Sequence, residues 1–319
     1  MESGTTATAE VYRGRFAPSP TGRLHLGSLL TAVSSWLVAR QRGGEWLVRI
    51  EDVDPPREVS GAADDILRQL EAAGLHWDGT VLRQSTRLSR YREIVQALVD
   101  TGAAYPCSCS RRQIAEHPDS GPHGLRYPGS CRAGPLRRGG PHAIRLRVPD
   151  GPVGFTDQLQ GPQACDLAGD TGDFVLWRKE DLPAYHLAVV IDDAEQDITE
   201  IIRGTDLLEA THAHLVLQRC LQLPTPAYMH VPVLVDDHGA KLSKQTGAAE
   251  LRRMELGQAL ARCLTWLGWQ VPDGLRKAPA PELLAAALDE VSLDTLAGRR
   301  VLATAVDATP TAATQNPLR

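Results

Sequence analysis

The chain has 319 residues and a net charge of −5, with hydrophobic and charged residues making up 42% and 23% of the sequence. These values fit a globular protein of two or three modules and argue against a generally basic nucleic-acid binder. No apolar run approaches the roughly 18 residues that span a bilayer. Residues 1–10 lack the basic start and apolar core of a signal peptide, so we expect a cytoplasmic protein without membrane attachment.

The first hundred residues alternate between strand-like and helix-like patterns. Strands are predicted at residues 11–17 and 45–50. Helices, with apolar residues three or four positions apart, are predicted at residues 26–40, 62–73 and 88–100. Because parallel strands need crossover connections, this order predicts an α/β fold with a parallel sheet.

The composition changes at about residue 105. From there to residue 173 the sequence is rich in Gly, Pro and Arg and shows no helix-period pattern, which predicts an insertion that splits the α/β domain. Alternation then resumes, with strands predicted at residues 187–191, 198–203 and 229–235 and a helix at 207–221. Helical patterns follow at residues 250–264, 282–290 and 292–297.

These changes divide the chain into six segments. They are a tail at residues 1–10, the first half of the α/β domain at 11–104, the insertion at 105–173, the second half at 174–235, a lysine-bearing loop with a helical region at 236–305, and a tail at 306–319. We expect the chain to be a monomer.

Two short segments far apart in the chain are the most informative about function. Residues 15–28 lead from the first strand into a helix that begins near His25, and a helix start offers unpaired N–H groups and partial positive charge to a phosphate. Residues 241–244 hold Lys241 and Lys244, two of only four lysines in a chain with thirty arginines. Either segment alone would read as an ordinary helix start or surface loop. Together they predict a nucleoside triphosphate site.

The cysteines and arginines of the insertion are also unevenly distributed. Six cysteines without a secretion signal are not expected to form disulfides, and Cys220 and Cys263 lie among apolar residues, as buried thiols do. Residues 107–147 contain eight arginines and only two acidic residues. This segment is either a solvated arginine-rich loop or a surface that contacts phosphates.

Five segments together resemble the class I aminoacyl-tRNA synthetases of the glutamyl branch. The segment Thr21-Gly-Arg-Leu-His-Leu-Gly27 is similar to the HIGH signature, and Lys241-Leu-Ser-Lys-Gln245 is similar to KMSKS. Residues 15–22, 49–52 and 201–206 match the glutamyl branch in the same order. The resemblance covers about residues 12–246 and implies a Rossmann-like parallel sheet, split by the insertion and followed by a helical region that contacts an RNA stem.

The resemblance also implies roles for individual residues. Those implied to bind glutamate are Arg15, Phe16, Ala17, Pro18, Ser19, Glu51, Tyr185 and Arg203. Arg15 would pair with a carboxylate of glutamate, and Glu51 would take its α-ammonium group. ATP, with Mg²⁺, would be bound by His25, Gly27, Lys241 and Lys244, of which the histidine and both lysines are the implied catalytic residues.

Simpler interpretations remain for several of these residues at this stage. Glu51 or Arg203 could be a surface charge, and Tyr185 could be a core residue. Asp192 and Asp193 read as caps at the end of the strand predicted at residues 187–191, in preference to metal ligands.

The chain departs from the full synthetase pattern at Ser28, Leu242 and Gln245 and in its length. About seventy-five residues follow Lys244, which leaves no room for a large helical anticodon-binding region. The chain thereby resembles the shortened glutamyl-queuosine family. That resemblance implies that glutamate is adenylated without tRNA and transferred to queuosine at the wobble position of tRNA(Asp). The alternatives are a truncated glutamyl-tRNA synthetase that charges the tRNA 3′ end, and a catalytically silent RNA- or zinc-binding module.

The same family has a zinc site formed by residues that match Cys107, Cys109, Tyr127 and Cys131. Three thiols and a phenol suit the tetrahedral, thiolate-rich sites that zinc prefers. Tyrosine is an uncommon ligand, so His117 or His123 is an alternative fourth ligand, and free thiols in a loop are an alternative to any metal. We expect one structural zinc ion, which would hold the insertion in shape.

Overall fold

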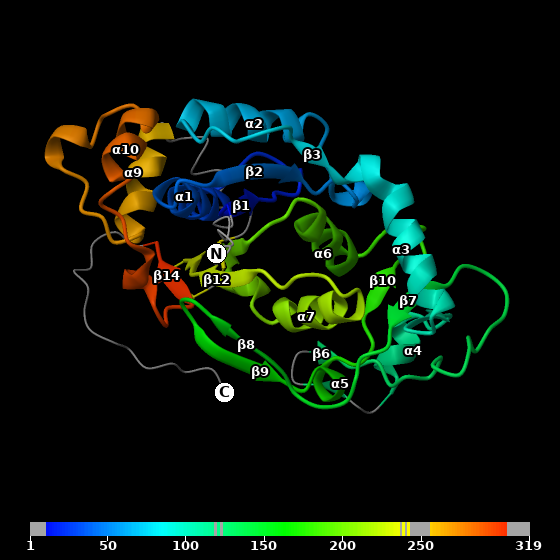
Figure 1. Cartoon of the computed structure of the whole chain (residues 1–319). Helices are drawn as coiled ribbons and strands as arrows, with labels where there is room; N and C mark the ends of the chain where they lie inside the picture. Colours follow the sequence, from blue (N-terminus) through cyan, green and yellow to red (C-terminus); the bar gives the residue numbers. More distant parts are fainter. Residues whose placement is uncertain are drawn as a thin grey trace, which may run out of the picture.

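The computed structural model describes residues 11–117, 120–121, 124–236, 238–239, 241–242 and 256–304. The first half of the α/β fold (blue in Figure 1) has three parallel strands, in which β2 (Glu45–Ile50) lies between β1 (Arg13–Phe16) and β3 (Leu82–Arg83). Helices α1 (Leu26–Gln41), α2 (Ala62–Ala73) and α3 (Leu88–Asp100) connect or follow these strands. The predicted strands and helices of this half are confirmed.

The second half forms a separate parallel pair of strands that lies beside the first sheet. Strand β11 (Glu200–Gly204) is parallel to β12 (Ala227–Val231), and α7 (Ala210–Cys220) connects them. Strands β1 and β11 lie side by side, and the N–H of Thr199 donates to the carbonyl of Arg13 at 2.9 Å. The connections from β1 and from β11 run in opposite directions, so the boundary between these two strands is a topological switch point, where α/β proteins usually bind ligands.

The strand predicted at residues 187–191 is wrong. These residues form the middle of helix α6 (Tyr185–Glu195), which packs against α7 and α3 and buries every residue from Leu187 to Asp193. A short, continuous apolar run fits a buried helix as well as a buried strand, because neither shows a polar face.

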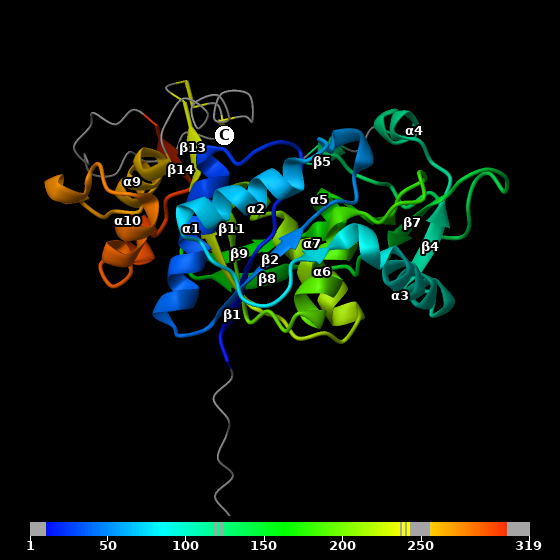
Figure 2. The same cartoon turned by 90° about the horizontal axis from the view of Figure 1, so that it is seen from above.

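The insertion forms a small antiparallel sheet and a separate hairpin. The sheet contains β4 (Ala104–Cys107), β7 (Ala143–Leu146) and β10 (Val175–Trp177), with β7 in the middle. The hairpin joins β8 (Val153–Asp157) to β9 (Gly161–Cys165) and packs against β12 and α7 of the second half. Figure 2 shows the sheet and the C-terminal helices at opposite ends of the molecule.

Several short elements of the insertion were not predicted. They are the two-residue strands β5 (Ser120–Gly121) and β6 (Gly124–Leu125) and the one-turn helices α4 (Arg111–Ala115) and α5 (Leu167–Asp170). The sequence showed no helical period in this segment, and the structure adds these two short helices. Helices of four or five residues are too short to show a helical period in the sequence.

The region after β12 also differs from the prediction. The strand expected at residues 229–235 is divided at Pro232, which has no N–H to donate, into β12 and β13 (Val233–Val235). Strand β13 is parallel to β14 (Val301–Ala303), a strand that the sequence did not suggest. Helices α9 (Leu256–Trp266) and α10 (Ala280–Ala287) are confirmed, whereas the third predicted helix is the 3₁₀ turn Leu293–Leu296. Both predicted tails and residues 250–255 lie outside the described residues.

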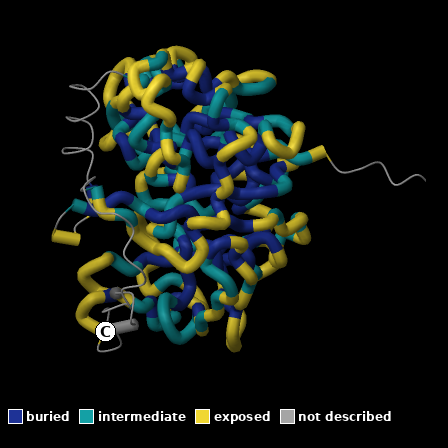
Figure 3. The backbone as a smooth tube through the Cα atoms, turned by 90° about the vertical axis from the view of Figure 1, so that its left-hand side faces the viewer, coloured by how far each residue is buried: buried dark blue, intermediate teal, exposed yellow. Residues whose placement is uncertain are grey.

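Buried residues gather in the interior of the molecule and exposed ones at its edges (Figure 3). One apolar core joins α1, the parallel sheet and the C-terminal helices, and a second joins α3, α6, α7 and the insertion. Helix α1 is buried on two sides because it lies between the sheet and α9. Cys263 is buried as predicted, but Cys220 is exposed at the end of α7. Within the described residues, no helix has both the length and the apolar character to cross a bilayer.

Candidate active site

A cleft of about 690 Å³ opens where the two halves of the α/β fold meet. Strand β1, the start of α1, the end of β2, the start of α6 and the end of β11 all contribute to it. The cleft brings together the predicted site residues Arg15, Phe16, Ala17, Pro18, Ser19, His25, Gly27, Glu51, Tyr185, Arg203 and Lys241. Lys244 and Gln245, which were also singled out in the sequence, lie outside the described residues.

His25 is the N-cap of α1. Its Nδ1 accepts a hydrogen bond from the backbone N–H of Ser28 at 3.3 Å, and the hydroxyl of Ser28 accepts one from the N–H of His25 at 2.8 Å. These reciprocal bonds form a capping box. A Cβ atom on Gly27 would lie 3.2 Å from the imidazole, so glycine lets the ring fold back over the helix start. Ser28, which departs from the HIGH signature, therefore has a structural role.

Lys241 reaches the cleft from the other half of the molecule. It pairs with Val235 in an isolated bridge, which holds its backbone beside β13. Its ammonium group lies 2.5 Å from a carboxylate oxygen of Asp206, just after β11. The sequence motif at residues 201–206 contains this aspartate, but sequence reasoning assigned it no role.

Two arginines are buried next to the cleft and share one carboxylate. Asp193 accepts hydrogen bonds from Nε and Nη2 of Arg15 at 3.0 and 3.3 Å and from Nη2 of Arg49 at 2.6 Å. The prediction that Asp192 and Asp193 cap a strand is wrong, because both lie buried in the last turns of α6. The Nε–Nη2 edge of the Arg15 guanidinium thus faces Asp193, and its Nη1 donates to the carbonyl of Ile202 at 3.5 Å.

Asp192 connects α6 to the first half of the chain through hydrogen bonds. It accepts hydrogen bonds from the side chains of Gln84, Tyr91 and Arg87, each at 2.8 Å. Burial raises the pKa of Asp192. Burial also opposes ionisation of Asp193, but the guanidinium groups of Arg15 and Arg49 outweigh it and lower the pKa of Asp193.

Glu51 directly follows β2 and lines the cleft. Its side chain is 10% exposed, and its Oε1 lies 3.9 Å from Nη2 of Arg49, so it is not a surface charge. Burial raises the pKa of Glu51 to about 7, against the opposing effects of Arg49 and Arg15. A cationic ligand group beside it would favour the carboxylate form.

Arg203, near the end of β11, is also not a surface charge, because only 4% of it is exposed. Its Nη1 donates to the hydroxyl of Tyr185 at 3.2 Å. Tyr185 is the first residue of α6 and lines the cleft, so it is more than a core residue.

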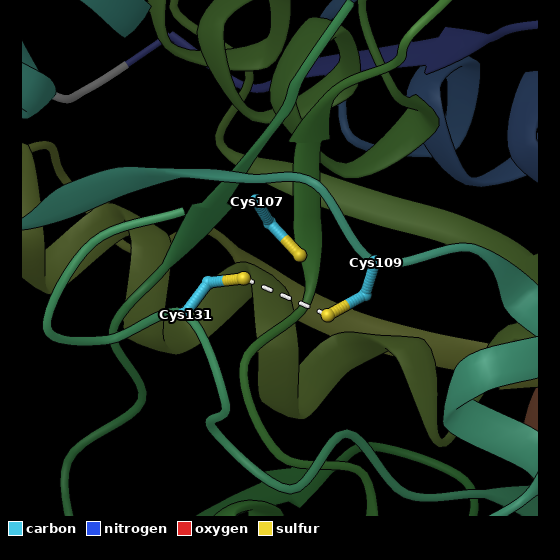
Figure 4. Close-up of side chains that lie close together, drawn as sticks. All are labelled: Cys107, Cys109 and Cys131. Atoms are coloured by element: carbon cyan, nitrogen blue, oxygen red, sulfur yellow. Dashed lines mark hydrogen bonds between the residues drawn. The ribbon is translucent and has the colours of Figure 1, made fainter. Parts of the chain in front are cut away.

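Three thiols of the insertion point toward one another (Figure 4). The sulfur atoms of Cys107, Cys109 and Cys131 all lie within 4.8 Å of one another. The hydroxyl of Tyr127 lies 3.4 Å from the sulfur of Cys107 and 4.0 Å from that of Cys109, and it accepts the N–H of Cys131 at 2.9 Å. In the part of the chain that the structure describes, no histidine nitrogen joins this group. His123 lies outside that part.

The chemistry of this group fits a thiophilic cation. Burial would raise the pKa of Cys131, but hydrogen bonds from the backbone of Leu136 and Ser108 outweigh it and lower the pKa to about 6. Burial and the neighbouring thiols raise the pKa of Cys109 to about 11. A metal ion would relieve this unfavourable clustering of thiolates. Arg145 donates to the sulfur of Cys107 at 3.3 Å.

The arginine-rich segment is neither wholly a solvated loop nor wholly a phosphate surface. Arg132 binds both carboxylate oxygens of Asp173 at 2.7 and 2.6 Å, and Arg145 is buried beside the thiols. Arg147 donates to two backbone carbonyls. These three arginines stabilise the insertion, although only Arg145 is buried; Arg132 and Arg147 are exposed, as are Arg111, Arg112, Arg137 and Arg138.

A family model agrees with this architecture. The catalytic domain of class I tRNA synthetases for E and Q matches residues 11–278. A solved glutamate tRNA ligase from Elizabethkingia meningosepticum, in complex with its amino acid, superposes with a TM-score of 0.75 at 26% identity and covers 92% of this chain and 67% of its own. The fold is therefore that of the catalytic domain of class I aminoacyl-tRNA synthetases.

Closer relatives define the family. The glutamyl-Q tRNA(Asp) synthetase of Chromobacterium violaceum is 53% identical over 263 residues, which are 82% of this chain and 88% of the relative. That of Dechloromonas aromatica is 50% identical over 288 residues, or 89% and 95% of the two chains. The chain belongs to the glutamyl-Q tRNA(Asp) synthetase family, a group of class I ligases. These relatives do not favour the alternative of a truncated synthetase that charges the 3′ end.

Proposed function

We propose that the protein activates L-glutamate with ATP, without tRNA, and transfers the glutamyl group to queuosine at the wobble position of tRNA(Asp). The single observation that carries this proposal is the cleft, in which Arg15, Glu51 and Arg203 lie with His25 and Lys241 from opposite halves of the α/β fold. Charged groups for an amino acid and donors for a triphosphate thus face the same space.

In the first step, an oxygen of the glutamate α-carboxylate attacks the α-phosphorus of ATP, and pyrophosphate leaves. Glu51 would hold the α-ammonium group, and Arg15 and Arg203 would provide positive charge for the carboxylates. In the second step, a hydroxyl of queuosine attacks the carbonyl of the mixed anhydride. An ester forms and AMP leaves, and no side chain of the protein becomes covalently attached.

The ATP side of the cleft would act by electrostatics and positioning. His25 would contact a phosphate oxygen at the start of α1, and Gly27 would let the nucleotide approach the backbone. Mg²⁺ bound to ATP would shield the phosphate charge. Lys241 would exchange Asp206 for the phosphates, and Lys244 would join it by analogy with the family motif.

Glutamate-dependent exchange of pyrophosphate into ATP, in the absence of tRNA, tests the first step. Transfer is then tested with paired samples of tRNA(Asp) that carry or lack queuosine. We expect exchange without tRNA and transfer only to the sample with queuosine. Absence of exchange by folded protein would refute glutamate activation, and equal charging of both tRNA samples would refute the acceptor.

Glu51 makes glutamate binding dependent on pH. Its raised pKa, about 7, means that the empty site loses the carboxylate as the pH falls through neutrality. We expect the KM for glutamate to rise by about tenfold per pH unit below that value, while the KM for ATP stays nearly constant. Exchange kinetics between pH 5.5 and 8 measure this. Glu51→Gln should give a high KM for glutamate that no longer changes with pH, and a sloping profile in that variant would contradict the assignment.

We also propose that Cys107, Cys109, Cys131 and Tyr127 hold one structural zinc ion. Zinc would supply charge that stabilises the thiolates, and with four protein ligands it would have no open position for chemistry. We expect about one zinc per chain in the wild type and in the exposed control Cys220→Ser, and its loss in Cys131→Ser. Elemental analysis of the purified proteins measures this, and equal zinc in Cys131→Ser and wild type would contradict the site.

A further inference from the structure

Arg203 is held by an unusually complete set of buried partners. Its Nε donates to Nε2 of His230 at 3.0 Å. Its Nη1 contacts the hydroxyl of Tyr185 and Nδ1 of His214, at 3.2 and 3.3 Å. Its Nη2 donates to the carbonyl of Leu207 and the hydroxyl of Thr211, at 3.2 and 2.9 Å. All five N–H groups of the guanidinium therefore have partners, so its orientation is fixed before substrate arrives.

His230, on β12, is a partner whose ring proton can lie on either of two nitrogens, Nδ1 or Nε2. It is fully buried, and burial lowers the pKa of its ring. A guanidinium N–H can only donate, so Nε2, which lies 3.0 Å from Nε of Arg203, carries no proton. Nδ1 lies 2.6 Å from Oδ2 of Asp157, a carboxylate that only accepts hydrogen bonds, so the proton is on Nδ1. Nε2 then has the lone pair that accepts the Nε–H of Arg203. The opposite tautomer would place two donors face to face.

Asp157 lies at the end of β8, in the hairpin of the insertion. Its Oδ1 accepts the backbone N–H groups of Leu159, Gln160 and His230, at 3.1, 2.9 and 3.2 Å. These three donors fix which oxygen faces the backbone and leave Oδ2 for the histidine. Only 1% of Asp157 is exposed, so water cannot replace it as the acceptor.

We propose that Asp157 and His230 are positioning residues for glutamate recognition, which through Arg203 aim the hydroxyl of Tyr185 at a carboxylate of the substrate. The hydroxyl accepts from Arg203, so its own proton is directed away from the guanidinium and into the cleft. Arg203 supplies charge and orientation, and Tyr185 supplies the direct hydrogen bond. This inference rests on the proposed activation of glutamate, and it makes the insertion hairpin a part of the amino-acid site.

The decisive variant is Asp157→Asn. The three backbone N–H groups would select the amide oxygen and turn the amide NH₂ toward His230, which would force its proton to Nε2. We expect the KM for glutamate to rise by about tenfold to a hundredfold, the usual effect of losing a buried bond to a charged group. The KM for ATP should change by less than about twofold. His230→Leu should behave alike, and His230→Gln, which can place an acceptor near Nε2, should recover most of the affinity.

His212→Gln is the matched control, because His212 is also buried, on α7, and has no hydrogen bond to Arg203 in the structure. It should leave both KM values unchanged. The inference is overturned if folded Asp157→Asn and His230→Leu keep the wild-type KM for glutamate, or if the KM values for glutamate and ATP rise together.

The ¹⁵N chemical shifts of the His230 ring give a readout that needs no substrate. They should report a proton on Nδ1 in the wild type and on Nε2 in Asp157→Asn. The same tautomer in both proteins would overturn the inference, whichever way the kinetics fall. If the wild type shows these shifts but no exchange with glutamate, the proposed function fails while the fixed orientation of Arg203 stands. If Asp157→Asn does not fold, the wild-type shifts and the kinetics of His230→Gln decide in its place.

Discussion

Asp193→Ala is expected to abolish glutamate activation and to lower the free energy of unfolding by about 3–5 kcal/mol. The carboxylate is 3% exposed and is shared by Arg15 and Arg49, whose side chains are 4% and 0% exposed. Its removal leaves two buried guanidinium groups without their main anion, and a buried charge without a partner is far more costly than an exposed one. Urea unfolding and the exchange assay measure the two effects.

Asp197→Asn is the matched control, because this carboxylate also pairs with an arginine of β1, Arg13, but is 83% exposed, and asparagine tolerates the left-handed backbone (φ 52°) at this position. It should cost less than about 1 kcal/mol and leave exchange intact. If Asp193→Ala proves too unstable to purify, Asp193→Asn keeps the shape and should show a smaller loss of stability with a raised KM for glutamate. Wild-type stability in both Asp193 variants would contradict the role of this residue.

His25→Asn is expected to reduce the rate of exchange by about a hundredfold, comparable to the loss of one transition-state donor. Asparagine is as good an N-cap as any residue, so it should keep the start of α1 while removing the longer imidazole. The free energy of unfolding should therefore change by less than about 0.5 kcal/mol. Single-turnover formation of the adenylate measures the effect on rate, and urea unfolding of the same variant measures the effect on stability.

Ser28→Ala should have the opposite effects, lowering stability and leaving the rate nearly unchanged. It removes the hydroxyl that accepts the N–H of His25 but keeps the backbone N–H that binds the imidazole. We expect a loss of stability of about 0.5–1 kcal/mol with little change in rate. If Ser28→Ala lost as much activity as His25→Asn, the effect would come from the helix start and not from the imidazole.

The sequence predicted those parts of the fold in which local pattern and chemistry agree. Strands β1 and β2 and helices α1, α2 and α3 each have a clear period and a clear stop, and residues at the ends of β1 and β2 and at the start of α1 line the cleft. The clustering of the three thiols was also predicted from the sequence. Cys107 and Cys109 are only two residues apart, so the fold needs to place only Cys131 beside them.

The predictions of secondary structure were wrong where an element is buried on all sides and so shows no alternation of polar and apolar residues. Helix α6 has apolar residues on every side, so its run of Leu187 to Ile191 read as a strand. That error also hid the roles of Asp192 and Asp193, since a carboxylate after a strand suggests a cap, whereas one inside a buried helix must have a cation. A polar residue such as His230 in an otherwise apolar strand was a usable signal, but its partner Asp157 is 73 positions away.

The separation along the chain between the two sides of the cleft has a consequence for biosynthesis. The contact between Arg15 and Asp193 closes a loop of 178 positions, and the one between Arg13 and Thr199 closes 186. Pairings of such long range form late, after the entropy of closing the loop has been overcome. A ribosome must therefore release most of the polypeptide before β11 can dock beside β1. Until then, Arg15 and Arg49 lack the carboxylate of Asp193 and remain hydrated.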